Sequence, residues 1–349
     1  MVEIPTDEIK IDKDYIFCFP GSSVSKEDTF DMKTHQFKYV PSEKGKEKLN
    51  GFIKLIYKLL GEKEVASSKK VIGIMYNYSE QELTMVRREY LADHNNYYDK
   101  QAKGFVTNIL SQLYISKESD SGKFSSQELH DNFSKLKIMS FSQGTVFAAM
   151  VGSCLVDKML QHKYPPEEIV SALKKAQLIG IGSAIEFGDT EKTSLFFNTI
   201  LFTDKNDCLA NSTVKKIGKN YVKKISDNIM QVITENPMEF RFYEQGTKTI
   251  GTLKDKQYHT PFSYALPKIG LKGEKIDNLS SFMVQNCVIN AFVNDEKDIT
   301  KIPLCLNEKQ LKSAFKKVYQ ERASFMINKA FGTRPTLKEV TIKEEIKIS

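Results

Sequence analysis

The stretch Lys137-Ile-Met-Ser-Phe-Ser-Gln-Gly-Thr-Val-Phe-Ala-Ala-Met-Val-Gly152 decides how this chain is organised. It begins with a short apolar run typical of a buried strand, and the small and apolar residues from Thr145 onward predict a helix packed on a sheet. The sequence Ser140-Phe-Ser142-Gln-Gly144 between them must reverse the chain within a few residues. Ser140 and Gly144 are small, so the strand and the helix can approach each other on either side of Ser142.

A turn this tight is expected to force Ser142 into a strained backbone conformation with its hydroxyl above the sheet. The amide of Gln143 then points at the same spot, so we predict Ser142 as a nucleophile and Gln143 as an oxyanion donor. The turn resembles the nucleophile elbow of the α/β-hydrolase superfamily, whose usual pattern is Gly-x-Ser-x-Gly. Ser140 stands where that pattern has its first glycine, and the alternative is a plain strand-to-helix connection.

A second feature of the superfamily is a Gly/Ser turn after an earlier strand. Tyr15–Phe19 is predicted as a buried strand, and it runs into Pro20-Gly21-Ser22-Ser23. Many members have a His-Gly-x turn here that supplies the other oxyanion amide, and Pro20 occupies the place of the histidine. Gly21 permits a sharp turn. The resemblance therefore implies the Ser22 amide as second donor, with Ser23 next, and the alternative is an ordinary strand-ending turn.

The resemblance also implies an acid and a histidine after later strands. The predicted strand 194–202 leads to Asp204 and Asp207, and we expect Asp207 as the triad acid with Asp204 in reserve. The alternative is that both acids cap a helix beginning near residue 212. His259 follows them and completes the order Ser, Asp, His known for this fold. Every other histidine precedes Asp207 in the sequence.

The remaining pattern predicts an α/β fold with a mostly parallel central sheet flanked by helices, and a C-terminal helical extension. We expect a polar leader at 1–13, an α/β-hydrolase-like core at 14–270 and the extension with a charged tail at 271–349. Residues 79–136 are extra helices or a lid. Other predicted elements are an irregular polar segment 24–42, helices 44–60, 167–175, 212–234, 282–293 and 308–330, and strands 70–76, 177–182 and 238–243.

The amino-acid composition bears on which binding partners to expect. Hydrophobic residues make up 40% and charged residues 27% of the 349 residues, as in ordinary globular proteins. The formal charge of +7 comes mostly from lysine. This favours an anionic membrane surface weakly and nucleic acid still less, because nucleic-acid sites favour arginine. The use of lysine, asparagine and isoleucine without tryptophan suggests an AT-rich, bacterial genome.

Several sites and segments are not expected. The five cysteines are odd in number and scattered, which indicates buried thiols in a reducing compartment. We find no metal-ligand spacing and no phosphate-binding loop, and the pair Gly180-Ile-Gly182 lacks the third glycine of a dinucleotide fingerprint. No cofactor is therefore expected.

With no cleaved signal and no long apolar stretch, we expect a cytoplasmic protein, with non-classical secretion into a host as the alternative.

The resemblance implies a serine hydrolase in which His259 deprotonates Ser142, and Asp207 orients the imidazole during attack on an ester carbonyl. We expect lipid or phospholipid esters as substrates, in a groove lined by Phe141, Tyr258, Phe262 and Tyr264. One alternative is an acyltransferase or thioesterase that uses the same residues. The other is an inactive protein of the same fold, whose C-terminal helices bind a protein partner.

Overall fold

The computed structural model describes residues 14–21, 25–31, 36–41, 43–61, 68–76, 78–79, 97–116, 122–183, 195–204, 207, 222–234, 239–244, 247–252, 279–299 and 301–302. The chain divides into two compact units, Met1–Leu304 and Cys305–Ser349. Every element below belongs to the first unit.

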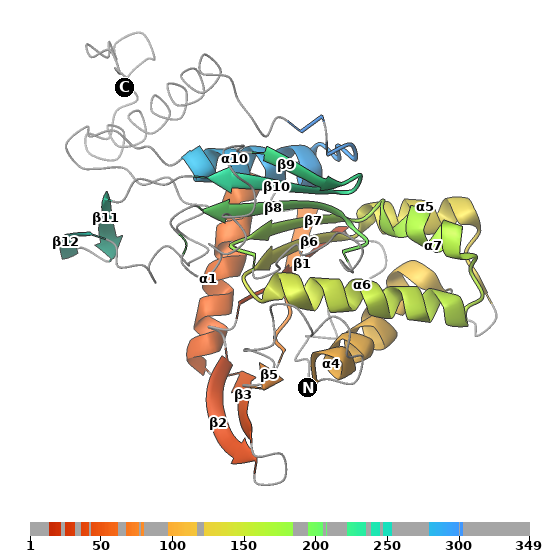
Figure 1. Cartoon of the computed structure of the whole chain (residues 1–349), viewed down its shortest axis with the longest axis horizontal. Helices are drawn as coiled ribbons and strands as arrows, with labels where there is room; N and C mark the ends of the chain where they lie inside the picture. The colour runs from red at the N-terminus through yellow and green to blue at the C-terminus, as the bar shows by residue number, and fades with distance from the viewer. Residues whose placement is uncertain are drawn as a thin grey trace. The chain divides into compact units, whose positions relative to one another are not determined.

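A seven-stranded sheet forms the centre of this unit, with the order β4-β1-β6-β7-β8-β10-β9 (Figure 1). Neighbouring strands run parallel, except that β9 is antiparallel to β10. The predicted α/β class with a mostly parallel sheet and flanking helices is confirmed. The strands are β1 (Asp14–Phe19), β4 (Lys69–Gly73), β6 (Lys137–Phe141), β7 (Gln177–Ile181), β8 (Asn198–Asp204), β9 (Val222–Ser226) and β10 (Ile229–Thr234).

Side chains of the central strands alternate between two hydrophobic clusters, because successive residues of a strand point to opposite faces. In β1, Phe17 and Phe19 enter one cluster, whereas Ile16 and Cys18 enter the other. All of these residues are completely buried. Both faces of the sheet are therefore covered, which explains the nearly continuous apolar runs of these strands.

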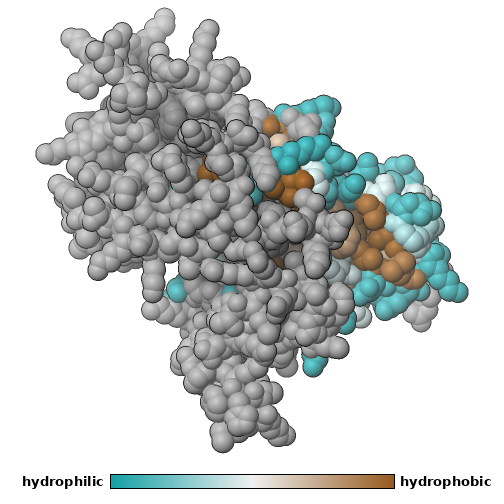
Figure 2. Space-filling model, viewed as in Figure 1, coloured by the Kyte–Doolittle hydropathy of each residue, from teal (hydrophilic) through white to brown (hydrophobic). Residues whose placement is uncertain are grey.

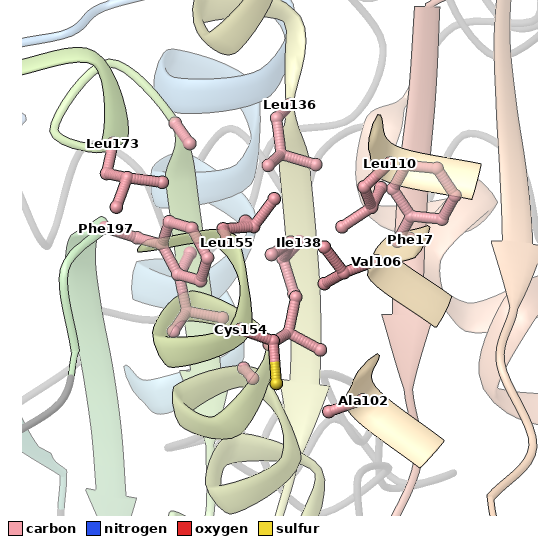
Figure 3. Packing of buried hydrophobic residues seen from close by; sticks show 14 of the residues in the cluster. Phe17, Ala102, Val106, Leu110, Leu136, Ile138, Cys154, Leu155, Leu173 and Phe197 are labelled. Carbon is pink, nitrogen blue, oxygen red and sulfur yellow. The ribbon is translucent and has the colours of Figure 1, made fainter. Parts of the chain in front are cut away.

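Helix α6 (Gly144–Gln161) packs on the face that carries Phe17, and Leu155 lies close to Ile138 of β6 in this cluster (Figure 3). Among the described residues, four helices are its neighbours on this face: α4 (Tyr97–Phe105), the π-helical segment η4 (Val106–Ile115), α5 (Ser126–Lys135) and α7 (Pro166–Leu173). Three of them, α4, η4 and α7, carry the labelled Ala102, Val106, Leu110 and Leu173. Within the interval 79–136, the described residues form mainly these helices; the exceptions are the end of β5 (Tyr78–Ser79), a short bridge at Ser116 and Lys123, and the non-helical residues 122, 124–125 and 136.

The opposite face carries α1 (Glu43–Leu60), α10 (Leu279–Val288) and the π-helical segment η7 (Ile289–Val293). Phe52 and Ile56 of α1 and Phe292 of η7 join Met139 of β6 in the second cluster. The helix predicted over 282–293 thus exists, and it packs against the sheet.

Two predictions about secondary structure are wrong. Residues 24–42 were expected to be irregular, but β2 (Ser25–Asp31) and β3 (Gln36–Pro41) form a hairpin that β5 (Tyr78–Ser79) joins. The helix expected over 212–234 is replaced, from residue 222 on, by the hairpin of β9 and β10. Its turn contains Asn228, whose amide donates hydrogen bonds to the carbonyls of Leu195 and Phe197. This side chain ties the turn to the chain leading into β8.

The strand predicted over 238–243 is present as β11 (Glu239–Glu244). It pairs with β12 (Thr247–Thr252) in a separate two-stranded sheet and does not extend the central one. Of the helices that the structure describes, none has both the length and the apolar character needed to cross a bilayer.

Candidate active site

The turn between β6 and α6 holds Ser142 in the left-handed region of the backbone, with φ of 52°. A residue with a Cβ adopts this conformation rarely and at a cost of roughly 1–2 kcal/mol. Two hydrogen bonds fix the turn: the Ser142 amide donates to the Ile181 carbonyl of β7 at 3.0 Å, and the Thr145 amide donates to the Ser142 carbonyl at 3.1 Å. The strain predicted for Ser142 is therefore present in the backbone.

Gly144 allows the start of α6 to touch the end of β1. A Cβ built on Gly144 would lie 2.0 Å from the Phe19 carbonyl oxygen and 2.9 Å from the Pro20 carbonyl oxygen. No larger residue fits without moving the helix or the strand. The small residue expected at this position is thus required by the close approach of two backbones.

Gly21, in the turn after β1, lies directly beside Ser142. A Cβ built on Gly21 would be 3.0 Å from the Ser142 Cβ and 2.9 Å from the Phe141 ring. The turn proposed to carry the second oxyanion amide is therefore adjacent to the predicted nucleophile. Ser22 and Ser23 themselves lie outside the described residues.

Gln143 is the N-cap residue of α6 and is almost completely buried. The N-terminus of a helix carries a partial positive charge, because the backbone dipoles align along its axis. Helix α6 has 18 residues, and Ser142 immediately precedes its cap. Negative charge that develops near the Ser142 hydroxyl would meet a favourable field from this helix.

The turn lies where the sheet connections change direction. The connection from β1 passes through α1 on one face to β4, and the connection from β6 passes through α6 on the other face to β7. Chains that leave adjacent strands toward opposite faces open a crevice at the carboxyl ends, where ligands bind in open α/β sheets. Phe19-Pro20-Gly21 and Phe141-Ser142 lie at those ends of β1 and β6.

The two candidate acids lie at the carboxyl end of β8, at the same edge of the sheet. Asp204 is the last residue of β8, and its carbonyl accepts a hydrogen bond from the Asp207 amide at 3.1 Å. Both residues are completely buried. Strand β8 is separated from β6 by β7, so about 10 Å divides the two strands. A third side chain is needed to connect either carboxylate with Ser142.

The predicted third side chain, His259, lies outside the described residues, as do Tyr258, Phe262 and Tyr264 of the predicted substrate groove. Phe141 is described, and it belongs to the hydrophobic core. The residue is 4% exposed, and its ring meets the Phe52 ring of α1 edge-on, with the centroids 6.3 Å apart.

Sequence reasoning missed two contacts around the turn. Ser140 Oγ and Thr145 Oγ1 lie 3.0 Å apart in a buried hydrogen bond that joins β6 to α6 beneath Ser142. Tyr76, just after β4, donates its hydroxyl hydrogen to the Pro20 carbonyl. The short spacing of Ser140 and Thr145 was readable from the sequence, whereas Tyr76 and Pro20 are 56 residues apart.

A second surface lies at the other end of α6. Hydrophobic atoms reach the surface where α5, α6 and α7 lie (Figure 2), and Leu160 and Val170 are exposed there. A groove runs between this end of α6 and the α4–η4 helix, lined by Lys103, Val106, Thr107, Cys154, Asp157, Lys158, Leu160 and Gln161. An 18-residue helix is about 27 Å long, so this surface is separate from Ser142.

Neither a protein-family model nor a curated protein matches the chain. Over the part of the chain with described placement, no three His, Cys, Asp or Glu side chains gather as a metal ion would require.

Proposed function

We propose that this protein is an α/β-hydrolase-like serine hydrolase that cleaves carboxylic esters with Ser142 as nucleophile. The observation that carries the proposal is the strained φ of 52° at Ser142, in a strand–turn–helix connection at the carboxyl edge of a parallel sheet. A serine in such a turn presents its hydroxyl above the sheet, clear of the strand and the helix that flank it.

The proposed reaction follows the chemistry of the Ser-His-Asp triad. His259 takes the hydroxyl proton of Ser142 as the serine oxygen attacks the ester carbonyl. The histidine then gives this proton to the departing alcohol, which leaves an acyl group on Ser142. Water, deprotonated by His259, releases the carboxylic acid and restores the serine. Asp207 holds the imidazole and stabilises its positive form, and Asp204 is the reserve for this role.

The negative charge on the attacked carbonyl oxygen needs hydrogen-bond donors. The Gln143 amide, at the start of α6, is the proposed first donor, and the Ser22 amide of the neighbouring turn is the second. The closeness of Gly21 to Ser142 supports this pairing. A donor of this kind contributes about 3 kcal/mol to the stability of the transition state.

Lipid and phospholipid esters are the proposed substrates. Tyr258, Phe262 and Tyr264 flank His259 in sequence and supply apolar surface for an acyl chain, and the excess of lysine favours an anionic membrane surface. The same residues would also pass the acyl group to an acceptor other than water. Product analysis with a competing alcohol distinguishes a hydrolase from an acyltransferase.

The test is hydrolysis of p-nitrophenyl esters of increasing chain length by the wild type and by Ser142→Ala. We expect release of nitrophenol by the wild type, with a preference for longer chains, and a loss of at least about 10³-fold in Ser142→Ala. Activity that survives the substitution would contradict the proposal. A folded but inactive wild type would favour the binding protein of the same fold.

A further inference from the structure

Tyr76 is held from two sides on the α6 face of the sheet. Its ring stacks on Phe147 of α6, with centroids 4.3 Å apart and planes 3° from parallel. Phe147 in turn meets the Phe19 ring edge-on at 5.1 Å. Tyr76 and Phe147 are both almost completely buried. The ring position of Tyr76 is therefore fixed by α6 and by the end of β1.

The hydroxyl of Tyr76 reaches the turn after β1, where it donates to the Pro20 carbonyl in a buried hydrogen bond. The peptide bonds of the described residues are all trans. In a trans peptide the carbonyl and the following N–H point in opposite directions within one plane. By holding the Pro20 carbonyl, Tyr76 therefore also sets the direction of the Gly21 N–H.

This peptide lies directly beside Ser142. Gly21 lies so close that its Cβ position is 3.0 Å from the Ser142 Cβ, and the Pro20 carbonyl is 2.9 Å from the Cβ position of Gly144. A rotation of the plane would change which backbone groups face the serine. Glycine at 21 offers little resistance to such a rotation, because it lacks the side chain that restricts other residues.

We propose that Tyr76 is a positioning residue for the Ser142 site. Its hydroxyl fixes the Pro20–Gly21 peptide beside the serine, at the start of the turn whose Ser22 amide is the proposed second oxyanion donor. The inference rests on the proposed function, because the position of these amides matters for reactivity only if Ser142 reacts.

The test compares two tyrosine-to-phenylalanine variants that each lose one buried hydroxyl. Tyr76→Phe keeps the stacked ring and removes the hydrogen bond to Pro20. Tyr164→Phe is the matched control, since the Tyr164 hydroxyl also donates to a backbone carbonyl, that of Ile115 at 2.9 Å. Tyr164 follows the far end of α6, away from Ser142.

The readout is covalent labelling by a fluorophosphonate at several probe concentrations, which separates the maximal labelling rate from the half-saturating concentration. We expect Tyr76→Phe to lower the maximal rate at least tenfold, because a misplaced oxyanion donor loses part of the about 10²–10³-fold that a complete removal of one donor costs. The final fraction labelled should stay as in the wild type, because the variant still folds. Tyr164→Phe should label at a rate within about twofold of the wild type.

A second variant tests the same inference in case Tyr76→Phe does not fold. Phe147→Leu removes the ring beneath Tyr76 and leaves the tyrosine hydroxyl, and we expect its maximal rate to fall in the same direction. A labelled wild type with unchanged rates in Tyr76→Phe and Phe147→Leu would overturn this inference alone. A wild type that takes no label would overturn the proposed function, and this inference with it.

Discussion

Ser140 Oγ and Thr145 Oγ1 lie 3.0 Å apart beneath the turn at Ser142, and both side chains are completely buried. The pair links the carboxyl end of β6 to the first turn of α6. It faces Gly180 of β7, whose Cβ position would lie 3.2 Å from each of these oxygens. The serine side chain is therefore accommodated at position 140 because the neighbouring strand has a glycine at the point of contact.

The hydrogen bond between these hydroxyls predicts an energetic coupling. Ser140→Ala and Thr145→Val should each lower the free energy of unfolding by about 1–3 kcal/mol, because each leaves a buried hydroxyl without this partner. The double variant should lose less than the sum of the two. Urea unfolding of the four proteins measures the coupling. Additive losses, within about 0.3–0.5 kcal/mol, would contradict a direct interaction.

Strain at Ser142 predicts an unusual order of stability. Glycine tolerates a φ of 52°, whereas alanine keeps the cost of its Cβ. Ser142→Gly should therefore be more stable than Ser142→Ala by about 1 kcal/mol, although glycine lowers stability at most positions. Thermal unfolding of the two variants checks this. An alanine variant as stable as the glycine variant would show that the turn is not strained in solution.

The contact of α6 with β1 predicts that Gly144 is intolerant of any side chain. Gly144→Ala should cost about 2 kcal/mol or more, because its Cβ would overlap the Phe19 carbonyl. Gly104 in α4 is the control, since a Cβ there meets no atom within 4 Å of the described structure. Gly104→Ala should raise stability by up to about 1 kcal/mol. Equal effects in chemical denaturation would refute the predicted packing.

A cluster of charges at the amino ends of the strands ties the segment after η7 to the sheet. The Asp295 carboxylate lies 3.2 Å from the Lys137 Nζ of β6 and 2.5 Å from the Lys297 Nζ. Partial burial by itself would raise the pKa of Asp295, but the hydrogen bond from Lys297 and the charge of Lys137 outweigh burial, so the pKa is lowered. Burial and the charge of Lys69 lower the pKa of Lys137.

These pKa shifts give the sign of a pH dependence. Asp295 has a lower pKa in the folded state than in the unfolded state, so its contribution is present above about pH 4 and disappears as the pH falls through the folded value. Asp295→Asn should cost about 1 kcal/mol at pH 7, a modest figure because water screens the half-exposed carboxylate. The difference from the wild type should shrink below pH 4.

The same difference in stability should shrink again in alkaline solution. Because the pKa of Lys137 is lowered, this lysine loses its charge at a lower pH than an exposed lysine does. Asp227 provides the control: it pairs with Lys224 at 2.8 Å on the surface, and Asp227→Asn should have the smaller effect. Urea unfolding across pH measures both variants. A cost of Asp295→Asn that is independent of pH would contradict an electrostatic role.

The sequence predicted the central part of the fold because its signals are local. Apolar runs gave β1, β6 and β7, and the small residues around Ser142 gave the turn between β6 and α6. The β2–β3 hairpin was missed because its first strand, SKEDTFD, has little apolar character. The helix predicted over 212–234 was wrong because the apolar residues from Val222 to Thr234 fit the spacing of a helix as well as that of a strand. The turn residues Asp227 and Asn228, which favour a hairpin, were overlooked.

The candidate site was only partly predictable for a different reason. Ser142, Gln143 and Gly144 are neighbours in the sequence, so their geometry follows from the turn alone. Tyr76 reaches Pro20 across 56 residues, and the sheet order that brings β4 beside β1 sets this contact. No local pattern in the sequence carries such information.

The most direct test of the account is the site of covalent modification by a fluorophosphonate, which reacts with an activated serine. Wild-type protein, Ser142→Ala and His259→Ala would be treated with the probe, digested and analysed by mass spectrometry. The account predicts one modified peptide, labelled on Ser142 in the wild type and unlabelled in both variants. Folded wild-type protein that takes no label, or a label on another serine, would contradict the claim that Ser142 is the nucleophile.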